Sequence, residues 1–134
     1  MSKVFCDKPF NHNYIHPNGK MRLCCTTVQD LPTDNNYNLF DANKHSIEDY
    51  WNSNRMKEIR RKMIAGEKIR DCERCYRQEE QGVESLRSTM GMNKLIADTE
   101  SDGTFMNSAT SMQIQLGNVC NLKCKMCSQM YSHM

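Results

Sequence analysis

The sequence is poor in aromatic residues, has little net charge and contains no long apolar run. Aromatic residues make up 7% of the 134 residues, so the core is expected to be modest, and small domains with thin cores depend on metals or disulfides. The net charge of +2 gives no reason to expect nucleic acid or a membrane surface as a partner. No stretch approaches the ~18 apolar residues of a membrane span, and the first residues lack the apolar run of a secretory signal. We therefore expect a cytoplasmic protein.

Eight cysteines are the candidates for that stabilising role. Thiols in the cytosol stay reduced, so clustered cysteines there bind metal more often than they form disulfides. The cysteines fall into three groups, which are Cys6 with Cys24 and Cys25, then Cys72 with Cys75, and finally Cys120 with Cys124 and Cys127.

Helix signals lie in the middle of the chain. Residues 46–65 are expected to be helical, because Ser46 and Asp49 form an approximate capping box before an apolar stripe. A second helix start at Ser53 is the alternative, because the polar residues around it are a poor helix interior. A further helix is expected over residues 79–97, with its inward face formed by Val83, Leu86 and Met90.

Strand signals lie at both ends. The dipeptide Asn18-Gly19 favours a hairpin turn, with Lys20 to Thr26 as the following strand. Residues 111–116 alternate between apolar and polar side chains, which is typical of a half-buried strand. Its buried face is expected to be formed by Met112, Ile114 and Leu116.

The last cysteine group has the spacing C-x3-C-x2-C at Cys120, Cys124 and Cys127. Three thiolates at this spacing can wrap one loop around a [4Fe-4S] cluster, which usually takes four cysteines. One iron would then stay open to a substrate or cofactor. The alternative is a zinc site, for which His133 is a possible fourth ligand at an awkward distance.

This motif, placed directly after a strand, resembles the signature of the radical S-adenosylmethionine superfamily. The resemblance implies that the open iron chelates S-adenosylmethionine and that the reduced cluster cleaves it to a 5′-deoxyadenosyl radical. It also implies a partial, TIM-like β/α barrel, of which residues 111–134 would be the first strand and the cluster loop. The family usually has an aromatic residue beside the adenine where this chain has Met126, and a polarizable thioether can fill that place.

The remaining cysteines combine into one four-cysteine site of Cys6, Cys24, Cys72 and Cys75, with Cys25 as a rival to Cys24. Taken by itself, this set fits a structural zinc site nearly as well as an iron-sulfur cluster. Cys6, Gly19 and Cys24 resemble the first motif of the SPASM and Twitch auxiliary-cluster domains, in which a cysteine is followed by G-x4-C. The resemblance implies a second, auxiliary [4Fe-4S] cluster, with zinc as the alternative metal.

The expected fold is therefore α+β, with a short hairpin and helices. Residues 1–98 would form the SPASM- or Twitch-like domain, residues 99–110 a linker, and residues 111–134 the start of the radical core. The implied function is that of a radical S-adenosylmethionine enzyme acting on a peptide or a small molecule, with a reductant such as flavodoxin or ferredoxin. Without the rest of a barrel, the chain is expected to be inactive alone. The alternatives are a non-catalytic zinc-binding module and, at lower rank, a thiol redox sensor.

Overall fold

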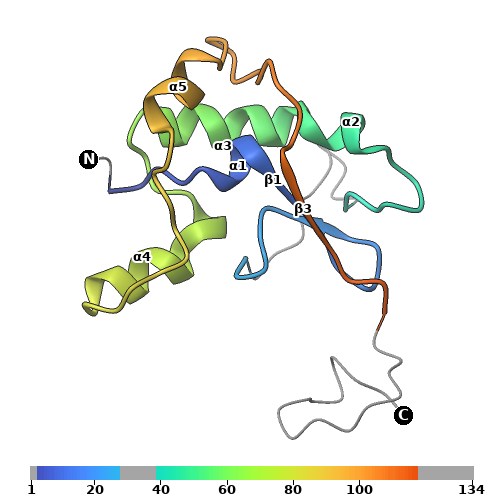
Figure 1. Ribbon diagram of the computed structural model, residues 1–134, viewed down its shortest axis with the longest axis horizontal. Helices are drawn as coiled ribbons and strands as arrows, with labels where there is room; N and C mark the ends of the chain where they lie inside the picture. The colour runs from blue at the N-terminus through green and yellow to red at the C-terminus, as the bar shows by residue number, and fades with distance from the viewer. Residues whose placement is uncertain (1–2, 28–38, 118–134) are drawn as a thin grey trace, which may run out of the picture.

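The computed structural model describes residues 3–27 and 39–117, which form an α+β fold around a small mixed sheet (Figure 1). The sheet has the strand order β2-β1-β3, with β1 antiparallel to β2 and parallel to β3. The elements are α1 (Lys8–Asn11), β1 (His12–Ile15), β2 (Met21–Arg22), α2 (Ile47–Trp51), α3 (Asn54–Ile64), the 3-10 helix η1 (Arg70–Cys72), α4 (Glu73–Glu80), α5 (Met92–Ala97) and β3 (Ser111–Ile114).

The expected hairpin is confirmed, with β1 and β2 as its arms. Tyr14 pairs with Arg22, and the chain turns through Gly19, whose φ of 84° is the left-handed conformation that glycine adopts without strain. The second arm is shorter than the expected Lys20 to Thr26, because the chain bends after Arg22. That bend turns the following residues, including Cys24, away from the sheet.

The helix expected over residues 46–65 is present as two helices, α2 and α3. The capping box is confirmed, because Ser46 accepts from the Asp49 amide and Asp49 accepts from the Ser46 amide. The second start at Ser53 is also confirmed, since its hydroxyl accepts from the Met56 amide. The chain leaves the second helix through Gly66, whose φ is 82°.

The core forms where α3 crosses α1, as Figure 1 shows. The helix buries one apolar stripe, formed by Met56, Ile59 and Met63. Phe10 stacks on Phe5 at a ring-centroid distance of 5.1 Å and makes an edge contact with Phe105 at 5.6 Å. Such aromatic pairs stabilise a core beyond the area that they bury, which matters in a chain with few aromatic residues.

The helix expected over residues 79–97 is wrong in its middle part. The helix α4 ends at Glu80 and α5 begins only at Met92, with Gly82 and Gly91 at positive φ between them. The side chains expected to face inward are exposed, at 51% for Val83, 59% for Leu86 and 79% for Met90. The two left-handed glycines interrupt the helical ladder, and the residues between them bind other parts of the chain.

The strand expected over residues 111–116 is present as β3, but the prediction of which face is buried is wrong. Met112 is 43% exposed, Ile114 51% and Leu116 94%. The glutamine side chains are the more covered ones, and Gln115 accepts a hydrogen bond from the Tyr14 hydroxyl at 2.8 Å. Alternation fixes which residues share a face, but partners elsewhere decide which face is covered.

Residues 99–110, expected to be a linker, pack on the helices in the structure. Phe105 is 3% exposed and belongs to the core cluster. The Trp51 indole donates to the Asn107 carbonyl at 2.8 Å. In the described residues, β3 pairs with β1 of the N-terminal part. The division into residues 1–98 and 111–134 and the barrel both stay predictions, because residues 118–134 lie outside the described part.

In the described residues, no helix combines the length and the apolar character needed to cross a membrane.

Candidate metal centre

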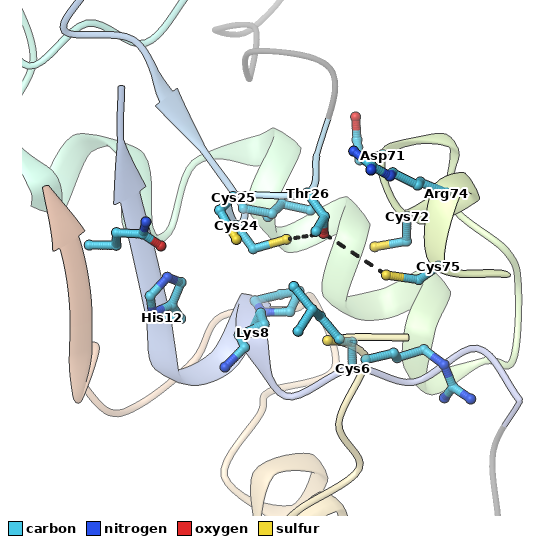
Figure 2. Close-up of a pocket in the computed structure, with 15 residues that line it drawn as sticks. Cys6, Lys8, His12, Cys24, Cys25, Thr26, Asp71, Cys72, Arg74 and Cys75 are labelled. Carbon is cyan, nitrogen blue, oxygen red and sulfur yellow. Dashed lines mark hydrogen bonds between the residues drawn. The ribbon is translucent and has the colours of Figure 1, made fainter. Parts of the chain in front are cut away.

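Three separate segments bring four cysteines to one place (Figure 2). Cys6 lies directly before α1, and Cys24 follows the bend after β2. Cys72 ends η1, and Cys75 lies in the first turn of α4, so the C-x2-C pair shares one side of a helical turn. The fold therefore joins residues that are up to about seventy positions apart in the sequence.

The C-x2-C segment is fixed to the long helix by a buried ion pair. Asp71 is buried and accepts from the Arg55 guanidinium of α3 at 2.6 Å. An arginine with a short bond to a buried carboxylate gives a charge-assisted contact of defined direction. The contact fixes the backbone beside Cys72 before any metal is bound.

The four cysteines line a cavity of about 240 Å³. Cys6 is 6% exposed and Cys75 is 7% exposed, so the cavity is well shielded on their side. The Cys24 Sγ lies 3.1 Å from the Thr26 hydroxyl, which in turn lies 4.0 Å from the Cys75 Sγ. Figure 2 shows Thr26 between these two cysteines.

Burial and neighbouring charges both act on the thiols that line the cavity. Burial is the largest cause that raises the pKa of Cys72, followed by the charges of Cys6 and Cys24, then Asp71 and Cys75. Burial also raises the pKa of Cys6. Thiolates that line one cavity repel each other, and a positively charged partner held between them favours the charged form.

A cavity of this size lined by four thiols has room for a polynuclear group, and a single zinc ion is the alternative. Zn–S bonds of about 2.3 Å in a tetrahedron place the sulfur atoms roughly 3.8 Å apart. Among residues 3–27 and 39–117, no three cysteine, histidine, aspartate or glutamate side chains are close enough to hold one metal ion. An iron-sulfide cage lies between its thiolates and keeps them farther apart, and the cavity supplies that space.

Cys24 and Cys25 differ in their surroundings. Cys25 lines the same cavity but is exposed, whereas Cys24 is partly buried and contacts the hydroxyls of Thr26 and Thr27. The charge of Cys24 acts on Cys6 and Cys72. These contacts favour Cys24, and the assignment of the ligands stays a prediction.

Cationic groups around the cavity were missed in the sequence. Lys8, Arg74 and Arg87 line it, together with His12. The His12 Nδ1 lies 2.6 Å from the Ser111 hydroxyl. Burial lowers the pKa of His12, and the Lys8 charge lowers it further. Lys8 and Arg74 are sequence neighbours of the cysteines, whereas no spacing in the sequence connects His12 or Arg87 to the site.

The other predicted cluster residues are not described. Cys120, Cys124, Met126 and Cys127 lie outside the described residues, as does His133. The cluster loop predicted for them stays a prediction.

Fold and site together define a class, a small α+β domain in which distant cysteines meet at a cavity suited to a metal cluster. Comparison with models of protein families identifies the family. The family model of SPASM, described as an iron-sulfur cluster-binding domain, matches residues 6–76, which is more than half of the chain. The chain belongs to this family, and membership supports iron-sulfur cluster binding. The match begins at Cys6 and includes Cys24, Cys72 and Cys75.

Searches of curated proteins and of solved structures gave no match.

Proposed function

We propose that this chain binds an auxiliary [4Fe-4S] cluster through Cys6, Cys24, Cys72 and Cys75. The observation that carries the proposal is one cavity lined by four cysteines, all of which lie within the residues that match the SPASM family. Four thiolates complete the coordination of such a cluster. A complete set leaves no iron open, so the proposed role is electron transfer or stabilisation of the fold.

The residues around the cavity suit an anionic cluster. A [4Fe-4S] core with four thiolates carries net negative charge, and its reduction potential depends on nearby charges, hydrogen bonds and exposure. Lys8, Arg74 and Arg87 place positive charge at the cavity wall. The buried sides at Cys6 and Cys75 exclude water. Together these features favour retention of the cluster.

We further propose that the chain is part of a radical S-adenosylmethionine enzyme. SPASM domains occur in such enzymes, and the C-x3-C-x2-C motif of Cys120, Cys124 and Cys127 resembles their signature. Cys120, Cys124 and Cys127 would hold a second cluster, which would supply an electron to S-adenosylmethionine, and Met126 would take the place of the aromatic residue that the family usually has there. The proposed partners are a peptide or small-molecule substrate and a reductant such as flavodoxin or ferredoxin.

Paired serine variants of neighbouring cysteines test the auxiliary site. The protein is reconstituted anaerobically with iron and sulfide, and absorbance near ~400 nm reports cluster binding. Cys24→Ser is expected to lose the absorbance of one cluster, and Cys25→Ser, the matched control, to keep it. Equal loss in both variants, or a colourless wild type containing stoichiometric zinc, would contradict the proposal.

Substitution of the last three cysteines tests the second proposal. S-adenosylmethionine is added to the reduced wild type and to a variant with Cys120, Cys124 and Cys127 changed to alanine. The electron paramagnetic resonance spectrum of the wild type is expected to change, because the cofactor binds an open iron, and that of the variant to stay constant. An unchanged wild-type spectrum would refute this assignment.

A further inference from the structure

The segment between α4 and α5 lies beyond the residues that match the SPASM family, yet it contacts the cysteine site. The Arg87 guanidinium donates to both Glu79 carboxylate oxygens at 2.8 Å and to the Phe5 carbonyl at 2.7 Å. The Ser85 hydroxyl donates to the same carboxylate at 2.6 Å. The Ser88 carbonyl accepts from the Asp7 amide at 2.8 Å. The segment therefore binds α4 and the N-terminal segment at once.

These contacts join the two halves of the cysteine set. Phe5 and Asp7 are the neighbours of Cys6 in the sequence. Glu79 lies four residues after Cys75 on α4, so both side chains are on one face of the helix. Arg87 therefore links the backbone at Cys6 to the helix that carries Cys75.

A second contact supports the same junction. The Tyr76 hydroxyl donates to the Val4 carbonyl at 3.0 Å. Both Tyr76 and Arg87 thus bind carbonyls of the segment that leads into Cys6. Tyr76 is neutral, whereas Arg87 adds a charge at the cavity wall, and its side chain is only 13% exposed. A charge so shielded from water acts strongly on its neighbours.

We propose that Arg87 is a positioning residue for the auxiliary cluster, fixing Cys6 relative to α4 and offsetting the negative charge of the cluster. This inference rests on the proposed function of the cysteine site. The pKa of Arg87 is raised, first by its hydrogen bond to Glu79 and less strongly by the Cys6 charge, which agrees with its place beside that thiol.

The two roles of Arg87 can be separated by substitution. Arg87→Gln removes the charge and the planar fork of donors. Arg87→Lys keeps the charge but cannot reproduce the bidentate contact together with the bond to Phe5. Glu79→Gln leaves the arginine in place and removes a negative charge near the cluster. Arg77→Gln is the matched control, because Arg77 pairs with Glu73 on the same helix with both side chains exposed by 60% or more.

The experiment compares the full chain and these variants after anaerobic reconstitution, with all of them also carrying alanine at Cys120, Cys124 and Cys127. The loss of cluster absorbance in the presence of a chelator gives a half-life, and a redox titration gives the reduction potential. Arg87→Gln is expected to lose the cluster roughly tenfold faster, as suits one charged hydrogen bond, and to have a more negative potential. Arg87→Lys should restore the potential more fully than the half-life.

Opposite shifts of potential distinguish this role from a merely structural one. Glu79→Gln is expected to make the potential less negative, and Arg77→Gln to change neither quantity. Urea unfolding of the cluster-free variants identifies any that do not fold, in which case Arg87→Lys and Glu79→Gln carry the test. Equal half-lives and potentials in wild type and the Arg87 variants would overturn the inference alone, whereas a wild type without any cluster would overturn the proposed function and the inference with it.

Discussion

Arg60 is a buried cation on which the packing of the domain depends. Its side chain is fully buried in α3, and its guanidinium lies 4.8 Å from the centre of the Trp51 ring. It donates to the carbonyls of Pro9 at 2.9 Å, Trp51 at 2.7 Å and Gly103 at 3.3 Å, and to the Asn52 side chain at 2.8 Å. One side chain thus joins α1, the junction of α2 and α3, and the segment before β3.

Replacement of Arg60 by methionine is expected to be strongly destabilising. The change leaves three buried carbonyls without this donor, and each unsatisfied buried group costs about 1–3 kcal/mol. Relief of the buried charge offsets part of that cost, since burial lowers the pKa of Arg60 to about 10 and the group is still charged at neutral pH. The expected loss is about 3–5 kcal/mol, a large part of the roughly 5–15 kcal/mol of a typical domain.

Urea unfolding of the cluster-free protein measures this loss. Trp51 is the single tryptophan of the chain, so its fluorescence reports directly on the environment of Arg60. Arg61→Met is the matched control, because the neighbouring side chain is exposed, and a change within about 0.5 kcal/mol is expected there. If Arg60→Met differs from that control by less than about 1 kcal/mol, Arg60 does not have the role assigned to it.

Two further substitutions test the backbone and the acid response. Gly103→Ala should lower the free energy of unfolding in urea by about 2–4 kcal/mol, because φ is 93° and the new Cβ would overlap the Lys57 carbonyl. Gly82→Ala is the control, because φ is also positive but nothing lies near the new Cβ, and it should lower that free energy by only about 1–2 kcal/mol. Equal losses in the two variants would refute the overlap. The Asn43 backbone amide, followed by Lys20, lowers the pKa of Asp41 to about 2, below the usual ~3.9. The stability that Asp41 adds should therefore be complete above about pH 4 and disappear as the pH falls through 2, so the urea midpoints of wild type and Asp41→Asn should converge in acid; a constant difference would contradict this.

The local features of the fold were predictable because they depend on neighbouring residues. The capping box at Ser46 and the turn at Gly19 follow from the chemistry of a few adjacent groups. The facing of β3 was not predictable, because Gln115 is covered through Tyr14, about a hundred residues earlier. The helix expected around Leu86 is interrupted by Gly82 and Gly91, which adopt positive φ.

The cysteines of the site were proposed from the sequence, whereas their surroundings come from the structure. The C-x2-C spacing of Cys72 and Cys75 and the G-x4-C spacing before Cys24 indicated a metal site. Their cavity, the buried Asp71 beside it and the cation of Arg87 come from tertiary contacts between distant segments. The preference for an iron-sulfur cluster over zinc rests on the resemblance, and the family match over residues 6–76 supports it.

The most direct test of the auxiliary cluster counts iron and sulfide at that site alone. A variant with Cys120, Cys124 and Cys127 changed to alanine keeps only the four-cysteine site and Cys25. After anaerobic reconstitution in the presence of iron, sulfide and zinc, the account predicts about four iron and about four acid-labile sulfide per chain. One zinc ion per chain with no sulfide would contradict it.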